Sequence, residues 1–495
     1  MARAAEWAVE PFVICLTAWL SVLRTYAACD DVVVATLAGS SLLRLTLKGR
    51  DPFRAAVAAV AAEVVASRPE ARLPLRFGAG PTSAEVVLQI EDVGGSLRLV
   101  LEYHRGTLDA ALAERLLAHV DVRLAAATAR PDTPLKALPL ASAEERRQLT
   151  SWGCPASAPL AAGTVTELFA EVARARPDGT AIVCGREHVT YHALARRAAA
   201  VAVALRAAGI VPGDRVVLQI GRGVRFVAGA LGVLRCGAAY VPVDPSEPAA
   251  RRQRMLEAIK PRLGLRESAR PGDDVVQAWL HASVADHEAE AALDAGLDPM
   301  AEPAIRGDTA AYVMFTSGSR GLPKGVAVPH RGIARLVRGQ SFARMGPDER
   351  WLHMAPVTFD ASTLEIWAPL LNGGRCVVLD DVVPSPAALD ATIRREAVTS
   401  AWITSSLFNV LVDEAPGCLA GLKQVLVGGE ALSPVHVRRA LSALPRLRLI
   451  NGYGPTENTT FTCCHDITAA DVEPGRTVPI GRPIAHTTVR VLDHR

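Results

Sequence analysis

Residues 309–328 read TAAYVMFTSGSRGLPKGVAV, and this stretch decides the fold. The run 312–316 is β-branched and aromatic, which predicts a buried strand, and a second apolar run follows at 326–328. The loop between them is rich in glycine and serine and contains Lys324. Small residues let backbone N–H groups converge on an anion, and lysine supplies a charge suited to phosphate. Because Gly325 follows Lys324, this is not a Walker loop; the alternatives are another kind of phosphate loop or a plain turn.

The composition bounds the class of protein. A chain of 495 residues exceeds one ordinary core, which predicts two or more domains. Hydrophobic residues make up 50% and charged residues 21%, as in a globular protein in water, and a net charge of +3 argues against binding to nucleic acid or a membrane surface. The nine cysteines are scattered without metal-ligand spacing, which favours reduced thiols and a cytoplasmic location.

An apolar run at 12–23 imitates a secretory leader. Arg3 precedes it, and the sequence YAAC at 26–29 resembles a lipoprotein cleavage site. However, Glu6 and Glu10 stand where a signal peptide carries positive charge, and the run is too short to span a bilayer. We therefore expect a buried helix here.

Helical and strand patterns alternate through the chain. In the first part we expect helices at 11–26, 53–67 and 109–127 and strands at 31–37, 85–91 and 97–103. Residues 131–160 are rich in proline and polar residues and are interpreted as a linker. Beyond it we expect helices at 165–176, 191–208 and 364–371 and strands at 180–184, 215–220, 240–243, 351–354 and 447–450. This alternation predicts a layered α/β architecture, with the acidic stretch 272–303 as a surface excursion.

Several motifs occur in the order known from one superfamily. After VTY at 189–191 come LRCGAAYVPVD at 234–244, the loop at 316–325, FDAS at 359–362, GGE at 428–430 and NGYGPTE at 451–457. Together they resemble the adenylate-forming, or AMP-binding, enzymes, which include acyl-CoA synthetases, luciferases and the adenylation domains of nonribosomal peptide synthetases. Arg320 departs from the pattern, which has threonine there. The resemblance implies that residues 161–495 form a layered α/β adenylate-forming core.

Asp360 points to the class of substrate. A lone aspartate before a helix is usually an N-cap, but in this family it binds the α-ammonium of an amino acid. An uncompensated buried charge costs about 3–5 kcal/mol, so the carboxylate favours an amino acid over a fatty acid. The resemblance places these residues on the substrate pocket: Asp360, Ala361, Leu364, Trp402, Leu426, Gly428, Gly452, Thr460 and Phe461. Its apolar walls resemble those of valine-selecting pockets, although isoleucine or leucine could enter, because a methylene is worth only about 1–3 kcal/mol.

The resemblance also implies a site for ATP and Mg²⁺. It assigns the phosphates to Thr316, Ser317, Gly318, Ser319, Gly321, Lys324 and Thr456, adenine to Gly429, Glu430, Asn451 and Tyr453, and the metal to Glu457. A flat aromatic suits a base, an amide suits its polar edge, and a carboxylate oxygen suits Mg²⁺. Tight turns at the ends of strands are the alternative for both glycine-rich motifs.

The implied reaction has two stages. A carboxylate attacks the α-phosphate of ATP and releases pyrophosphate, and the phosphopantetheine thiol of a carrier protein then takes the acyl group. The family's ribose-binding motif, hinge and small C-terminal subdomain with its catalytic lysine do not follow within the chain, so we expect no complete catalytic set. A piece of a longer synthetase is the favoured hypothesis. The alternatives are a non-catalytic remnant and an acyl- or aryl-CoA ligase.

Residues 1–130 resemble the C-terminal half of a condensation domain of the same synthetases, a partial α/β domain. Three segments carry the resemblance: 11–36, 108–126 and 134–149. The family's catalytic motif begins with two adjacent histidines, and no such pair occurs in this chain. We therefore expect no condensation activity from it.

Overall fold

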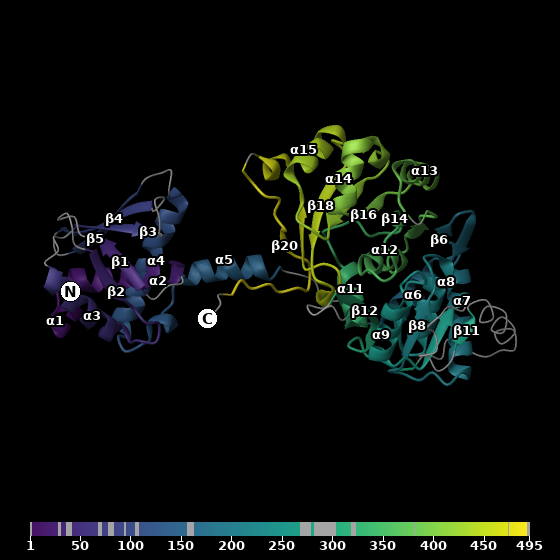
Figure 1. The fold of residues 1–495 in the computed structure, drawn as a ribbon, viewed down its shortest axis with the longest axis horizontal. Coiled ribbons are helices and arrows are strands. Elements are labelled where there is room, and N and C mark those ends of the chain that lie inside the picture. Colours follow the sequence, from purple (N-terminus) through teal and green to yellow (C-terminus); the bar gives the residue numbers. More distant parts are fainter. Residues whose placement is uncertain are drawn as a thin grey trace. The chain divides into compact units, whose positions relative to one another are not determined.

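The computed structural model describes residues 2–27, 31–35, 42–67, 72–77, 84–93, 96–103, 108–155, 163–267, 279–281, 303–317, 323–381, 383–473 and 475–492. The chain forms two compact units, Met1–Thr150 and Ser151–Arg495 (Figure 1). Both units mix helices and sheets, so the predicted α/β class is confirmed.

The first unit is built around a buried helix. Its helices are α1 (Ala2–Trp7), α2 (Pro11–Ala27), α3 (Phe53–Ser67) and α4 (Ala110–Ala129). Its strands form two antiparallel sheets, β1 (Asp31–Ala35) with β2 (Leu42–Thr46), and β3 (Arg72–Phe77), β4 (Ala84–Val93) and β5 (Ser96–Tyr103) in that order. Leu16, Trp19 and Leu20 of α2 are fully buried, which confirms the buried helix predicted for this run. Among the described residues, no helix is long and apolar enough to cross a membrane.

The segment interpreted as a linker has regular structure. It contains a short 3-10 turn, η1 (Leu135–Ala137), and the helix α5 (Ala143–Gly153). Leu135 and Leu138 are buried in the core of the first unit. The backbone N–H of Glu145 donates to the Ser142 hydroxyl at 3.0 Å, an interaction typical of the start of a helix.

The second unit contains two sheets whose interiors are mostly parallel. The six-stranded sheet has the order β11-β10-β8-β9-β12-β13, and the nine-stranded sheet has the order β20-β19-β18-β17-β16-β14-β15-β6-β7. Strands of the first are β8 (Arg215–Gln219), β9 (Ala239–Pro242), β10 (Leu263–Arg266), β11 (Trp279–His281), β12 (Ala310–Ser317) and β13 (Pro323–Pro329). Strands of the second are β6 (Thr180–Cys184), β7 (Glu187–Thr190), β14 (Arg350–His353), β15 (Arg375–Val378), β16 (Ser400–Thr404), β17 (Gln424–Gly428), β18 (Arg448–Tyr453), β19 (Cys463–Asp466) and β20 (Arg482–Pro483).

Helices connect and cover these sheets. They are α6 (Val165–Ala175), α7 (Tyr191–Ala207), α8 (Val224–Arg235), α9 (Ala249–Ile259), α11 (His330–Val337), α12 (Ala361–Leu370), α13 (Pro386–Glu396), α14 (Ser405–Glu414) and α15 (Pro434–Ala443). Every residue of α12 is buried, including Ser362, Thr363 and Glu365, and most of its side chains are apolar. The predicted excursion at 272–303 falls mostly outside the described residues, although β11 within it pairs in parallel with β10.

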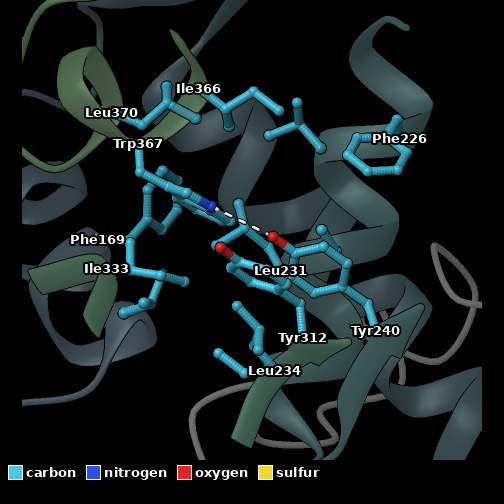
Figure 2. Packing of buried hydrophobic residues seen from close by; sticks show 14 of the residues in the cluster. Phe169, Phe226, Leu231, Leu234, Tyr240, Tyr312, Ile333, Ile366, Trp367 and Leu370 are labelled. Atoms are coloured by element: carbon cyan, nitrogen blue, oxygen red, sulfur yellow. Dashed lines mark hydrogen bonds between the residues drawn. The ribbon is translucent and has the colours of Figure 1, made fainter. Parts of the chain in front are cut away.

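A large aromatic core lies beneath α12. The Trp367 indole of α12 donates to the Tyr240 hydroxyl at 3.4 Å, and the rings of Tyr240 and Tyr312 are 5.5 Å apart (Figure 2). Tyr240 belongs to β9 and Tyr312 to β12, so this core joins α12 to the sheet that leads into the 316–325 loop. Burial raises the pKa of Tyr240 well above its usual 10, which keeps its hydroxyl neutral.

Candidate functional site

The strands of the opening motif form as predicted. β12 and β13 pair antiparallel, with Thr316 opposite Lys324 and Ser317 opposite Pro323. The Thr316 hydroxyl donates to the Lys324 carbonyl at 3.4 Å. Of the loop residues, Gly318, Ser319 and Gly321 lie outside the described residues, as does Arg320, and Ser317 is described only as the end of β12.

Three parallel strands bring distant pocket residues to one edge. Trp402 pairs with Leu426 in register, and Gly428 at the end of β17 lies opposite both Thr404 of β16 and Gly452 of β18. The carboxyl ends of parallel strands are where open α/β sheets bind ligands. The register thus places these predicted pocket residues side by side.

Two glycines on this edge are required by close packing. A Cβ added to Gly428 would lie 2.2 Å from the Gly452 carbonyl oxygen and 3.8 Å from Trp402 Nε1. A Cβ added to Gly452 would lie 2.4 Å from the Phe461 ring. Trp402, Gly428, Gly452 and Phe461 therefore form one continuous surface. Gly429, by contrast, has open space around it. Its φ of +90° favours glycine there because of the backbone conformation of the turn.

The apolar pocket residues share one buried cluster. Ala361 and Leu364 come from α12, Trp402 and Leu426 from the strands, and Phe461 from the turn after η4 (Thr456–Asn458). Phe461 meets the ring of Phe342 edge-on at 5.8 Å, and Trp402 packs against Phe359 at 5.5 Å. These residues therefore belong to one buried core, and their role as a substrate pocket stays a prediction.

Asp360 is the charged member of this group. It precedes α12, but its side chain makes no capping hydrogen bond to the helix, unlike an ordinary N-cap. Only 7% of its surface is exposed, and the Thr460 hydroxyl donates to its carbonyl at 2.8 Å. Burial raises the pKa of its carboxyl above the usual 3.8, and hydrogen bonds from the Thr456 hydroxyl and the Thr460 backbone partly offset this. In the part of the chain that the structure describes, no cationic side chain pairs with it.

The predicted adenine residues lie at the ends of β17 and β18. The Tyr453 ring is 49% exposed, as a stacking platform requires. Asn451 is buried, and its amide nitrogen donates to the Pro479 carbonyl at 2.8 Å, which fixes its orientation. The Glu430 carboxylate accepts a hydrogen bond from the Ser406 hydroxyl at 3.3 Å.

Two charged residues assigned to phosphate and metal face each other. The Lys324 ammonium lies 3.5 Å from Glu457 Oε1, and both side chains are more than half exposed. Thr456 and Glu457 belong to η4, the short turn that also supplies the Asp360 contact. The start of β13 and the 451–457 motif are therefore adjacent, so that one nucleotide could contact both.

Two buried charged groups were missed by the sequence reasoning. Arg335 of α11 donates to backbone carbonyls of the 458–461 turn; no motif marks it, since its partners are more than 120 residues away. Glu365 of α12 lies 2.7 Å from His353 Nδ1 and accepts from two backbone N–H groups at 3.0 and 3.1 Å. A lone glutamate in an otherwise apolar helix was a usable signal for this second group.

One sizeable hollow of the second unit lies elsewhere. A cavity of about 660 Å³ is bordered by α6, Leu234 and residues 303–305. None of the pocket or nucleotide residues described above lines it, and its walls include Glu167 and Glu171. Chemistry, rather than cavity size, therefore identifies the candidate site.

Comparison with known proteins gives a consistent result. The model of the family described as AMP-binding enzyme matches residues 169–495. A linear gramicidin synthase from Brevibacillus parabrevis is 39% identical over 416 residues, 83% of this chain and 8% of that protein. Malpibaldin synthetase from Mortierella alpina is 37% identical over 420 residues, again 83% of this chain and 8% of the relative. The chain thus spans less than a tenth of the length of these two relatives.

Solved structures are similar over about two thirds of the chain. Holo-PA1221, an NRPS protein containing adenylation and PCP domains, superposes with a TM-score of 0.63 at 40% identity, covering 68% of this chain and 57% of that one. The N-terminal subdomain of NpsA from Klebsiella oxytoca, bound to 3-hydroxybenzoyl-AMSN, superposes with a TM-score of 0.61 at 27% identity, covering 65% and 80%.

Proposed function

This chain belongs to the AMP-binding enzyme family, and we propose that it activates an amino acid as an aminoacyl adenylate for nonribosomal peptide synthesis. The synthetase relatives and the adenylation-domain structure support this branch of the family over acyl- or aryl-CoA ligases.

The observation that carries the proposal is the buried carboxylate of Asp360. Within the described residues it has no cationic partner, and burial raises the pKa of its carboxyl. A substrate α-ammonium would supply the missing positive charge. Its attraction to the carboxylate would be stronger there than in water, because the surroundings are apolar. A fatty acid offers no such group.

We propose valine as the amino acid. Asp360 would hold the ammonium, and the side chain would lie against the apolar wall made by Ala361, Leu364, Trp402, Leu426, Gly428, Gly452, Thr460 and Phe461. Trp402 and Phe461 fill much of the space, which favours a short branched side chain. Isoleucine and leucine would bind more weakly rather than be excluded.

ATP would lie across the ends of the strands. Tyr453 would stack on adenine, Asn451, Gly429 and Glu430 would border it, and Lys324, Thr316 and Thr456 would face the phosphates with the 317–321 loop. Glu457 offers a carboxylate oxygen of the kind Mg²⁺ prefers, and the metal would neutralise phosphate charge when bound. The chain's own residues would orient the amino-acid carboxylate toward the α-phosphate; such positioning is the main contribution to phosphoryl-type transfers.

The partners and neighbouring regions follow from the same proposal. The acyl group would pass to the phosphopantetheine thiol of a carrier domain. We propose that 1–130 is part of a condensation domain and that 161–495 is the adenylation core, with 131–160 between them. The alignment to the gramicidin synthase covers 83% of the chain, more than the family match at 169–495 alone, which supports a synthetase origin for the preceding region. The cytoplasmic location stays a prediction from the scattered cysteines.

ATP–pyrophosphate exchange with a panel of acids tests the proposal. We expect the fastest exchange with valine and slower exchange with isoleucine and leucine. A panel led by a polar or aromatic amino acid would refute valine, and one led by a fatty or aryl acid would refute amino-acid activation altogether. Calorimetric binding of valine and of ATP belongs beside it, because binding of both without exchange would show a recognition core without the complete catalytic set, as the sequence leads us to expect.

A further inference from the structure

The turn that follows η4 has an unusual backbone. Thr459 and Thr460 are consecutive β-branched residues with φ +54° and +63°, in the left-handed region that such residues rarely adopt. Backbone strain of this kind persists only where the surroundings hold it in place. Something outside the turn must therefore fix its shape.

Arg335 is the side chain that makes this connection. Its Nη2 donates to the carbonyls of Asn458, Thr459 and Phe461, the latter two at 3.1 and 3.0 Å. Its Nη1 donates to the Thr487 hydroxyl at 2.6 Å. The two hydrogens of Nη2 are shared among three carbonyls of a single turn while Nη1 reaches Thr487, a two-nitrogen span that a lysine ammonium cannot reproduce.

The environment of Arg335 is costly for a cation. It is 9% exposed, and burial lowers the pKa of its guanidinium to about 10, so it remains charged near neutral pH. No carboxylate forms an ion pair with it in the described part of the chain. Its position is therefore maintained by the carbonyls of the turn and by close packing. A Cβ added to Gly332, one helical turn earlier, would lie 2.6 Å from the Thr459 hydroxyl oxygen.

The turn supports the amino-acid pocket on two sides. The Thr460 hydroxyl donates to the Asp360 carbonyl at 2.8 Å, and the Thr460 backbone also contacts the Asp360 carboxyl. The Phe461 ring closes against Gly452. A shift of the 458–461 turn would therefore move both the ammonium-binding carboxylate and the apolar wall.

We propose that Arg335 is a positioning residue for the amino-acid pocket: by holding the 458–461 turn it sets where Asp360, Thr460 and Phe461 meet the substrate. This inference rests on the proposed function, and it adds a residue that touches neither substrate. Its contribution should be larger for the amino acid than for ATP, since Tyr453 and Lys324 lie outside the turn that it holds, although Thr456 and Glu457 adjoin Asn458 in η4.

Binding measured separately for valine and ATP tests this selectivity. We expect Arg335→Gln to raise the Kd for valine about tenfold or more and to raise the Kd for ATP by a smaller factor. Arg338→Gln is the matched control, because Arg338 follows the same helix and donates to the Leu371 carbonyl at 2.6 Å. It should bind both ligands as the unmodified protein does. Equal weakening of valine and ATP, or equal effects of the two substitutions, would overturn the inference.

Two further measurements keep the test decisive. Amide hydrogen exchange across 456–464 in the ligand-free protein should be about tenfold faster in Arg335→Gln and unchanged in Arg338→Gln. Unchanged exchange would overturn the inference even if valine proves not to bind, whereas failure of the unmodified protein to bind any amino acid would contradict the proposed function instead. Adding Thr459→Gly, which relieves the left-handed strain, should restore part of the valine affinity of Arg335→Gln; no recovery would count against the mechanism. If Arg335→Gln fails to fold, Arg335→Lys takes its place, with a smaller expected loss.

Discussion

The ammonium of Lys324 lies 3.5 Å from the carboxylate of Glu457, although 133 positions separate them in the sequence. Lys324 belongs to β13 and Glu457 to η4, so this contact joins the strand after the phosphate-type loop to the turn after β18. In the proposed complex Lys324 would contact phosphate and Glu457 would contact the metal, in place of their contact with each other. The ion pair therefore marks the place where the two halves of the nucleotide site meet.

Lys324→Gln should weaken ATP binding without unfolding the protein. Because both charges are well exposed, their mutual attraction contributes only about 0–1 kcal/mol to stability. We expect the Kd for ATP to rise about tenfold and the Kd for adenosine to stay unchanged, since only ATP presents phosphates. Lys423→Gln, at another exposed lysine, is the control. Equal loss for ATP and adenosine would remove Lys324 from the phosphate site.

Asp360 predicts how valine affinity depends on pH. Burial raises the pKa of the Asp360 carboxyl above 3.8. In the free protein, ionisation of this group therefore lowers the free energy of unfolding as pH rises from 3.8 through the raised pKa. Valine's ammonium binds the ionised form, so affinity should be full above the raised pKa. Below it we expect the Kd to rise about tenfold per pH unit. Calorimetry across the range measures this slope.

Asp360→Asn provides the comparison for that titration. An amide cannot balance the ammonium charge, so we expect the Kd for valine to rise on the order of 100-fold. The dependence of this Kd on pH that comes from the Asp360 carboxyl should disappear. ATP binding, measured at the same pH values, should follow the unmodified protein. A variant that keeps both the affinity and its pH slope would show that another group holds the ammonium.

Regular elements were predictable because burial and periodicity coincide in them. α3 and β6 begin and end at the predicted residues, since an Ala/Val-rich helix and a fully apolar strand leave no competing register. The helix α5 was interpreted as part of a linker, although Ser142 followed three residues later by Glu145 is a helix-start signal. The helix leaves the linker interpretation a prediction, since the boundary between the two units falls within α5.

The site residues likewise divide into those that a local sequence motif marks and those that it does not. Positions such as Asp360, Gly428 and Gly452 could be named from motifs, and the parallel register of β17 and β18 then brings the two glycines together. Arg335 could not, because a side chain that serves a turn more than 120 residues away leaves no local pattern. The left-handed threonines were equally hidden, since β-branched residues normally argue against such a conformation.

Gly452→Ala should damage the substrate pocket more than the nucleotide site. The added Cβ would lie 2.4 Å from the Phe461 ring, which must then turn away from Gly452. Overpacking of this kind costs about 1–3 kcal/mol, so we expect about a tenfold or larger rise in the Kd for valine. Gly417→Ala is the control, since open space surrounds that position. Unchanged valine affinity in Gly452→Ala would exclude Phe461 from the pocket wall.

His330 at the start of α11 predicts a pH-dependent stability of the second unit. It is fully buried, and its Nδ1 accepts a hydrogen bond from the Val165 backbone N–H at 3.1 Å, so the ring is neutral in the folded protein. Burial lowers the pKa of the imidazole from 6.5 to about 4. The unfolded chain therefore takes up a proton first as pH falls. Stability should be complete above pH 6.5 and decline toward pH 4, by up to about 3 kcal/mol.

Thermal unfolding of the unmodified protein and of His330→Asn between pH 7.5 and about 4 measures this contribution. Asparagine keeps an acceptor near the Val165 N–H but does not titrate, so it should cost some stability at neutral pH and lose less on acidification. The difference in melting temperature between the two proteins should therefore shrink as pH falls from 6.5 toward 4. Carboxylates and other histidines titrate in both proteins and cancel in that difference. A constant difference across the range would mean that His330 is protonated in the folded state, which its buried acceptor bond to Val165 argues against.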